Sequence, residues 1–352
     1  MNGELTDIRP TFIDLFSGCG GLSYGFIMAG WRPLFAVEKD PSAAQSYQLN
    51  FNCPVWAGLI EDFVSELENR RIVFPKVNAI IGGPPCQGFS PLGKMSAKQE
   101  TIENHNSLND LWAYFLRSVE LLKPDIFITE NVPEFIRSQE FKKYENKAKK
   151  LGYFLNPNVL NAAEFGVPQK RKRAFCIGSL KGDPPLPRKS SERSNVRDAI
   201  GHLPLQPDNK NWHIGRNPTK KSYERYQVIP PGGNRFDLMK NRPDITPPCW
   251  LKKKKGTTDV FGRLEWDKPA STIRTEFFKP EKGRYLHPEA HRPITHREAA
   301  CIQTFPDSFI FFGSKIDVAR QIGEAVPPLL AEAVAETILD HLKEEEKHGS
   351  KR

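Results

Sequence analysis

Four side chains in the first half of the chain have the chemistry of a nucleophile and its acid–base partners. Cys86 lies in "GGPPCQGFS", directly after the apolar run "VNAIIGG", and a cysteine thiolate is a strong nucleophile. Glu130 ends a second apolar run, "PDIFITENV". Arg171 and Arg173 alternate in "FGVPQKRKRAF", so on an extended segment both point to one side, which could face Glu130. The pattern predicts a nucleophile and an acid on adjacent strand ends.

Each of these residues also has an ordinary structural explanation. Most cysteines are buried and inert, and a carboxylate at a strand end often only caps a helix or pairs with a lysine. Cys86, however, begins a polar, proline-stiffened segment that is followed by loop-like sequence. A cysteine at the start of such a loop favours a reactive role over a packing role.

A glycine-rich turn follows the first apolar run, in "DLFSGCGGLSYGF". Gly18, Gly20 and Gly21 allow a sharp turn that brings the backbone close to a ligand at the N-terminus of the next helix. Glu38 ends the following apolar run, where an acidic side chain can accept hydrogen bonds from ribose hydroxyls. The turn predicts a cofactor that contains a nucleoside. At this level a NAD-dependent oxidoreductase would look similar.

The elements that must position these residues alternate between predicted strands and predicted helices. Between residues 11 and 180, the apolar runs "TFIDLFS", "RPLFAVE", "VNAIIGG", "PDIFITENV" and "RAFCIGS" alternate with stretches of helical length. This alternation is typical of parallel strands joined by crossover helices in a doubly wound sheet, whose ligands bind at the carboxyl edge. Regular structure is also expected at 297–304, and one long amphipathic helix is expected over 318–344.

Residues 181–296 differ from the rest of the chain in charge and composition. They carry a net charge of +11 in a chain whose total is +9, and they contain fifteen of the thirty prolines. We therefore expect a loop-rich second domain at 181–296 and a larger domain formed by 1–180 and 297–352. The excess positive charge predicts a surface that meets phosphates, with a solvated basic face as the alternative.

The remaining composition narrows the class of protein. The six cysteines are scattered without a CxxC pair, which gives little support to a disulfide framework or a metal site. No window approaches the roughly 18 apolar residues of a membrane span, and the N-terminus lacks a secretion signal. We expect a cytoplasmic protein without a metal.

With these residues assembled, the chain resembles the cytosine-5 DNA methyltransferases. The segments "DLFSGCGG", "GGPPCQGFS", "ENV", "QKRKR", "REAACIQTFPDSF" and "QIGEAVPP" occur in the order and spacing of that family, from residue 11 to about residue 330. The resemblance implies a Rossmann-like methyltransferase sheet, S-adenosylmethionine as methyl donor and double-stranded DNA as substrate. The target cytosine would be flipped out of the duplex.

The resemblance also implies roles for individual residues. Cys86 would add to carbon 6 of cytosine and Glu130 would serve ring nitrogen 3, while Arg171 and Arg173 would hold the carboxylate and the carbonyl oxygen of the base. Cofactor contacts would fall on Phe16, Gly18, Gly21, Leu22, Glu38, Lys39, Asp62, Phe63, Pro84, Leu111, Ala325 and Val326. DNA contacts would fall on Gln87, Ser90, Lys252, Lys253, Lys254 and Lys255, and residues 181–296 would form the target-recognition domain.

Two positions depart from the usual family pattern. Lys39 replaces a residue that is often aromatic in relatives, and Glu324 replaces a common asparagine in the last motif. Both changes affect expected cofactor contacts and leave the expected reaction unchanged.

Three alternatives compete with a DNA methyltransferase. A transfer-RNA cytosine-5 methyltransferase shares much of the active site, but the long recognition segment favours the reading of DNA sequence. A non-catalytic DNA-binding relative would not need Cys86, Glu130 and Arg173, and a NAD-dependent oxidoreductase shares only the glycine turn. The compact size fits a monomeric modification enzyme of the bacterial cytoplasm, with a cognate restriction endonuclease as a candidate partner.

Overall fold

The computed structural model describes residues 9–85, 111–252 and 255–349, and these residues form two compact units. The first unit takes its described residues from 1–160, 172–189 and 330–352, and the second comprises 161–171 and 190–329. The second unit therefore reaches further toward the C-terminus than the predicted segment 181–296. The functional division into a catalytic and a recognition domain stays a prediction.

The first unit is built on a central sheet, which has seven strands among the described residues in the order β3-β2-β1-β4-β5-β8-β6. Neighbouring strands from β3 to β5 pair in parallel. The predicted α/β class is confirmed. The strands are β1 (Thr11–Leu15), β2 (Arg32–Glu38), β3 (Val55–Ala57), β4 (Ala79–Gly82), β5 (Ile126–Asn131), β6 (Phe154–Asn161) and β8 (Lys172–Ser179).

One expectation about this sheet is wrong. The run "RAFCIGS" forms β8 as predicted, but β8 is antiparallel to β5, with Asn131 paired to Ala174 and Ile126 to Ser179. A fully buried apolar run has no sequence feature that records its direction, so periodicity could not distinguish the two arrangements. The reversal places the start of β8 beside the end of β5.

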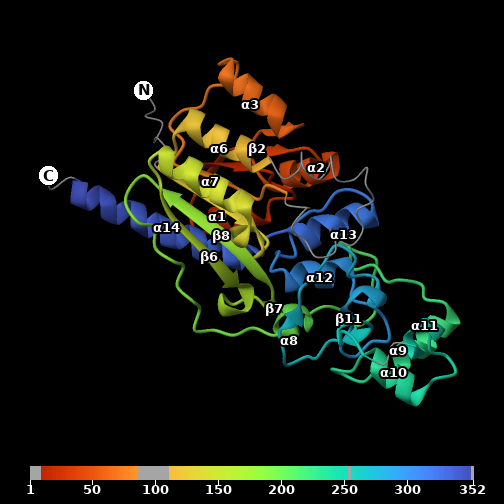
Figure 1. Cartoon of the computed structure of the whole chain (residues 1–352). Helices are drawn as coiled ribbons and strands as arrows, with labels where there is room; N and C mark the ends of the chain where they lie inside the picture. The colour runs from red at the N-terminus through yellow and green to blue at the C-terminus, as the bar shows by residue number, and fades with distance from the viewer. Residues whose placement is uncertain (1–8, 86–110, 253–254, 350–352) are drawn as a thin grey trace. The chain divides into compact units, whose positions relative to one another are not determined.

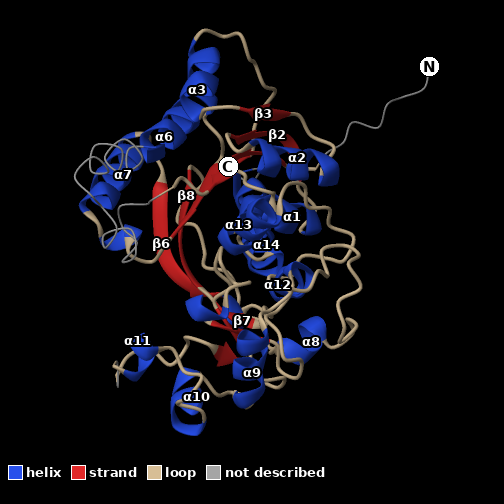
Figure 2. Ribbon diagram, turned by 90° about the vertical axis from the view of Figure 1, so that its right-hand side faces the viewer, coloured by secondary structure: helices blue, strands red, loops and turns tan. Residues whose placement is uncertain are grey.

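Helices cover both faces of this sheet (Figures 1 and 2). On one face, side chains of α3, α6 and α7 pack on Ile13, Leu15, Ile80 and Phe127 of the strands. On the other face, α1 and α14 approach the sheet, and the Trp31 indole donates a hydrogen bond of 3.2 Å to a carbonyl of α14. These helices are α1 (Gly21–Met28), α2 (Pro41–Asn50), α3 (Ile60–Glu68), α6 (Leu111–Leu122), α7 (Gln139–Lys150) and α14 (Pro328–Gly349), with a short 3-10 helix η2 (Phe135–Arg137).

The expected single helix over 318–344 is also wrong, because the structure has two helices there. The first, α13 (Lys315–Glu324), ends before Ala325, and α14 starts at Pro328. Pro327 and Pro328 lack the amide hydrogen that a continuous helix would need, although Pro328 suits the first turn of a new helix. Apolar spacing continues on both sides of the break, which is why periodicity alone predicted one helix.

The second unit consists mainly of loops and short elements, as its proline content predicted. Tyr226, Leu238 and Phe261 form part of a small apolar core near α9 and α10. The buried guanidinium of Arg263 donates to the carbonyls of Tyr226 (2.6 Å) and Ile229 (2.7 Å), which ties the loops together. The elements are η3 (Ala162–Glu164), β7 (Gln169–Lys170), α8 (Val196–Ile200), α9 (Lys220–Val228), α10 (Arg235–Asn241), α11 (Pro248–Leu251), β9 (Gly262–Arg263), β10 (Ala270–Ser271), η4 (Pro280–Lys282), β11 (Arg284–Leu286), α12 (His296–Ile302) and α13.

Within the described part of the chain, none of the helices combines the length and the apolar character that a membrane span requires.

Candidate active site

The strand register gathers the predicted site residues of the first unit at one edge of the sheet. Leu15 at the end of β1 pairs with Val37 of β2 and with Gly82 at the end of β4, and Gly82 pairs with Thr129 of β5. The segments that follow these strands therefore leave the sheet at the same edge. This edge holds the glycine turn, Glu38 at the end of β2, Glu130 near the end of β5, and residues 83–85, which lead to Cys86.

The glycine turn after β1 has the backbone conformation that its sequence predicts. Gly18 and Gly20 have φ angles of 56° and 97°, in the region that favours glycine. A side chain at Gly20 would collide with the ring of Phe51, whereas a Cβ at Gly18 would meet no atom within 4 Å. The turn therefore packs tightly at Gly20 and leaves open space at Gly18, before α1 begins at Gly21.

Glu38 joins the end of β2 to this turn. Its Oε2 accepts a hydrogen bond of 2.8 Å from the amide of Gly18, and its Oε1 accepts one of 2.7 Å from the amide of Asp40. Burial raises the pKa of the Glu38 carboxyl, and these two backbone hydrogen bonds partly oppose the rise. A carboxylate has about four acceptor sites, so Glu38 can hold the turn and still accept from a ligand.

The other predicted cofactor residues of the first unit differ in exposure. Phe16 is half-buried and has a φ of 61°, while Lys39 and Asp62 are exposed. The ring of Phe63 is fully buried and stacks on Phe35, so its side chain belongs to the core. The remaining ones are buried: Leu22 in α1, Pro84 after β4 and Leu111 at the start of α6.

Ala325 and Val326 lie between α13 and α14 and belong to the second unit. The carbonyl of Ala325 accepts a hydrogen bond of 3.2 Å from the Gln303 side chain, and the Val326 side chain is buried. These two contacts hold the backbone of the break between α13 and α14 in place.

Glu130 and Arg173 form an ion pair at the edge of the sheet. Arg173 Nε lies 3.0 Å from Glu130 Oε1, and the two side chains are only 19% and 11% exposed. The antiparallel pairing of β8 with β5 explains this contact, because it places Arg173 one residue before the partner of Asn131. The opposite charges of a guanidinium and a carboxylate at this distance attract each other, which favours one orientation of the carboxylate.

The described hydrogen bonds of Arg171 belong to the second unit, and the expectation that both arginines face Glu130 stays a prediction. The buried guanidinium of Arg171 donates to the carbonyls of Ile273 (3.1 Å), Gly323 (3.0 Å) and Glu324 (3.1 Å), all within the second unit. Arg171 lies between β7 and β8 and not inside one extended strand, so the alternation assumed from the sequence does not apply.

The segment that leads to Cys86 is held by a hydrogen bond and passes near a carboxylate, and the sequence analysis identified neither feature. Asn131 Nδ2 donates a hydrogen bond of 2.9 Å to the carbonyl of Pro84. A Cβ built on Gly83 would lie 3.1 Å from Glu130 Oε2, so this segment passes close to the carboxylate. The motif "ENV" was the available signal for Asn131. Cys86, Gln87 and Ser90 lie outside the described residues.

A buried polar group beneath the glycine turn was also missed. Asp14 in β1 accepts a hydrogen bond of 2.6 Å from Ser23, whose hydroxyl lies 2.8 Å from the Tyr47 hydroxyl. Burial raises the pKa of the Asp14 carboxyl to about 8, although the Ser23 hydrogen bond opposes the rise. An acidic residue within the apolar run "TFIDLFS" was the signal that could have identified it.

The lysine run of the second unit is partly described. Lys252 and Lys255 are exposed, whereas Lys253 and Lys254 lie outside the described residues. Lys252 and Lys255 are therefore accessible for contact with solvent or with a phosphate.

Comparison with known proteins gives consistent matches over almost the whole chain. The family model for C-5 cytosine-specific DNA methylase matches residues 10–340. The type II methyltransferase M1.HphI of Haemophilus parahaemolyticus is 37% identical over 341 residues, covering 94% of this chain and 86% of the relative. The type II methylase M.HgiDII of Herpetosiphon aurantiacus is 34% identical, covering 93% and 94%.

A solved structure agrees with this result. A prophage-encoded E. coli protein, described as a DNA modification methyltransferase, matches with a TM-score of 0.72 and 27% identity. The match covers 95% of this chain and all of that chain. The expected Rossmann-like methyltransferase fold is confirmed.

Proposed function

Because the chain belongs to the family of C-5 cytosine-specific DNA methylases, we propose that it transfers a methyl group from S-adenosylmethionine to carbon 5 of cytosine in duplex DNA. The observation that carries this proposal is the Glu130–Arg173 ion pair beside the segment that leads to Cys86. Such a pair supplies an oriented acid next to the expected nucleophile. Family membership disfavours the oxidoreductase and transfer-RNA alternatives.

The first unit fits the adenosine part of the methyl donor. Gly18 borders open space at the N-terminal end of α1, and Glu38 has acceptor sites for ribose hydroxyls. The half-buried ring of Phe16 offers a surface for stacking. When bound, S-adenosylmethionine supplies an electrophilic methyl group.

The residues of this chain would activate the cytosine. The Cys86 thiolate adds to carbon 6, and Glu130 donates a proton or hydrogen bond to ring nitrogen 3, which makes carbon 5 nucleophilic. Arg173 holds the Glu130 carboxylate in place during this step. Transfer of the methyl group would leave S-adenosylhomocysteine. A base then removes the proton from carbon 5, the Cys86 thiolate is eliminated, and the proton at ring nitrogen 3 returns to Glu130, which restores the aromatic ring.

Arg171 has a positioning role in this proposal. Its hydrogen bonds to the carbonyls of Ile273, Gly323 and Glu324 hold the end of α13 and the start of the break before α14. The base contact expected from the resemblance is less consistent with a guanidinium that is already bound to three carbonyls.

Recognition of the DNA sequence is assigned to residues 181–296. Their charge of +11 suits contact with phosphates, and exposed Lys252 and Lys255 are candidates for it. The type II names of the relatives support a role as the modification enzyme of a restriction–modification system, paired with an endonuclease. We expect the enzyme to act as a monomer in the bacterial cytoplasm.

Bisulfite sequencing of DNA from cells that express the protein tests this function, because it reports the modified base and its sequence context together. We expect protected cytosines at one recurrent sequence, and their loss with Cys86→Ala. Cells that express Glu134→Gln, a substitution of an exposed side chain outside residues 181–296, serve as the control and should keep the protected sites. Unprotected DNA from cells with soluble wild-type protein would contradict the proposal.

A further inference from the structure

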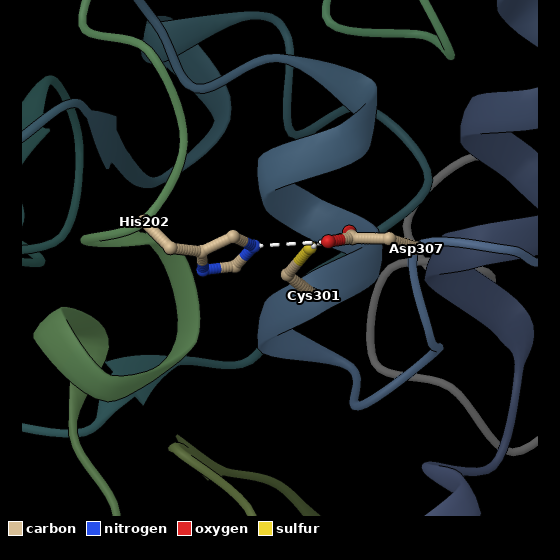
Figure 3. Close-up of side chains that lie close together, drawn as sticks. All are labelled: His202, Cys301 and Asp307. Atoms are coloured by element: carbon tan, nitrogen blue, oxygen red, sulfur yellow. Dashed lines mark hydrogen bonds and ion pairs between the residues drawn. The ribbon is translucent and has the colours of Figure 1, made fainter.

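The second unit brings together three side chains of the types that bind transition metals. His202 follows α8, Cys301 lies in α12, and Asp307 follows Pro306 in the loop after α12 (Figure 3). One ligand atom from each residue lies within 4.8 Å of the other two. We propose that His202, Cys301 and Asp307 form a binding site for a divalent transition metal, with Zn²⁺ as the best match.

The distances between these atoms suit a tetrahedral ion. His202 Nε2 lies 3.1 Å from Asp307 Oδ2, and Cys301 Sγ lies 3.4 Å from Asp307 Oδ1. Zinc bonds of about 2.3 Å to sulfur and about 2.0–2.2 Å to nitrogen and oxygen separate tetrahedral ligands by roughly 3.4–3.6 Å. Small side-chain movements would therefore bring the three atoms into place.

The donor types also suit this ion. Imidazole nitrogen, thiolate and carboxylate are the three protein ligands of zinc, and one thiolate with one carboxylate balances a charge of +2. Magnesium and calcium prefer oxygen ligands alone, so the cysteine and histidine disfavour them. Binding would replace the thiol proton that Cys301 now donates to Asp307.

The backbone around Asp307 is held in position by neighbours. Arg297 donates to the carbonyls of Pro306 and Phe309, each at 3.0 Å, and the Asn211 side chain donates to the carbonyl of Asp307 at 2.6 Å. Because Arg297 is buried and engaged with these carbonyls, it fixes the loop instead of occupying the site. Such support orients a ligand before the metal arrives.

A cavity beside the cluster provides access and room for a fourth ligand. Its volume is about 310 Å³, and its lining includes all three residues together with Asp198 and Thr304. This is ample for a water molecule, and zinc sites with three protein ligands commonly hold one.

The bound metal would link separate segments of the second unit and so stabilise it. His202 and Asp307 have side chains that are 51% and 54% exposed, and a polar contact between such exposed groups adds little stability by itself. A shared metal would instead tie the segment after α8 to α12 and to the loop that follows it. Because it binds only the folded unit, it would raise the thermal midpoint of unfolding.

Metal titration of the purified full-length protein tests the site. We expect one equivalent of Zn²⁺ to bind, and one equivalent of Co²⁺ to produce the near-ultraviolet thiolate-to-metal absorption that reports a cysteine ligand. His202→Ala and Asp307→Ala should each weaken Zn²⁺ binding at least tenfold, and Cys301→Ser should remove the Co²⁺ thiolate band. Cys249→Ser, at the exposed thiol, should change neither signal.

Three results would overturn the proposal. These are the absence of a Co²⁺ thiolate band in the folded protein, a band that disappears with Cys249→Ser, and wild-type Zn²⁺ affinity in His202→Ala. Because His202 is exposed, its alanine variant should keep the fold, which circular dichroism can verify. All of these readouts are independent of methyl transfer, so the two proposals can fail separately.

Discussion

At the scale of single residues, the contact between Arg173 and Glu130 is the most informative feature of the site. The carboxylate is 11% exposed, Arg173 fixes its orientation, and Gly83 passes beside its second oxygen. Sequence spacing could bring Cys86, Glu130 and Arg173 into one hypothesis because each lies at or next to one end of an apolar run. It could not reveal the hydrogen bonds of Asn131 and Arg171, whose partners depend on how distant segments pack.

We expect Glu130→Gln to lower the rate of methyl transfer by about 100- to 10,000-fold, because the amide keeps the shape but cannot donate the same proton. Transfer of labelled methyl groups to DNA measures the rate, and circular dichroism verifies the fold. Glu134→Gln provides a matched control, since Glu134 is exposed and only a few residues away. Near-normal turnover by Glu130→Gln would remove Glu130 from the mechanism.

Asp14 gives the fold a specific dependence on pH. Its carboxyl has a pKa of about 8 when folded, against an ordinary value of 3.8. As pH rises from about 4 to 8, the unfolded chain loses this proton while the folded protein retains it. The contribution of Asp14 therefore lowers the free energy of unfolding progressively across this window, and the loss is complete above it.

Asp14→Asn should remove this contribution, since the amide oxygen can still accept the Ser23 hydrogen bond. Between pH 5 and pH 8, we expect the variant to gain stability relative to the wild type by about 2 to 4 kcal/mol. Urea unfolding at both pH values measures the change, and the difference between the two proteins cancels the other titrating groups. A difference that does not change with pH would contradict the assignment.

At the scale of elements, the sequence predicted the strands that have a long and regular apolar pattern. Five apolar runs became β1, β2, β4, β5 and β8, but the three-residue β3 was too short to recognise. Strand β6 contains Pro157, which is tolerated at the edge of a sheet yet weakens a strand pattern. The direction of β8 and the break between α13 and α14 depend on tertiary packing and on two prolines.

The C-terminal helix should be essential to the first unit although it lies at the end of the chain. In α14, Val334 and Ile338 are fully buried, His341 Nε2 lies 3.1 Å from the Ser179 hydroxyl, and the helix accepts the Trp31 hydrogen bond. Removing residues 318–352 should therefore abolish binding of S-adenosylmethionine and lower the thermal midpoint sharply.

Removing only residues 345–352 should be nearly silent, because Glu345 and Lys347 are exposed. Calorimetric titration with S-adenosylmethionine and thermal unfolding, applied to both truncations, measure the two effects. A folded 1–317 fragment with near-normal cofactor affinity would show that the end of the chain does not belong to the site.

At the scale of the whole molecule, charge and chemistry belong to different parts of the chain. Residues 181–296 carry a net charge of +11, and the rest of the chain carries −2, since the total is +9. The Glu130–Arg173 pair and the glycine turn belong to the first unit. Composition predicts this division, and the separate roles of the two parts stay a prediction. The cluster of His202, Cys301 and Asp307 remained hidden because His202 and Asp307 are 105 residues apart and form no spacing motif.

Replacing Lys252, Lys253, Lys254 and Lys255 with alanine should weaken binding to specific and non-specific DNA alike. Each lost phosphate contact should reduce the slope of log affinity against log salt concentration by about 0.9, because fewer counterions are released. Fluorescence anisotropy with cognate and scrambled duplexes measures both slopes. An altered methylation sequence in this variant would instead assign these lysines to base reading.

The central claim is that Cys86 adds to the cytosine ring before the methyl group is transferred. Replacing the target cytosine by 5-fluorocytosine tests it directly, because fluorine cannot leave carbon 5 as the proton does. With S-adenosylmethionine present, we predict a DNA–protein adduct that survives denaturing electrophoresis and that peptide mass spectrometry places on Cys86. An enzyme that methylates ordinary DNA yet forms no adduct, or forms one at another residue, would contradict the account.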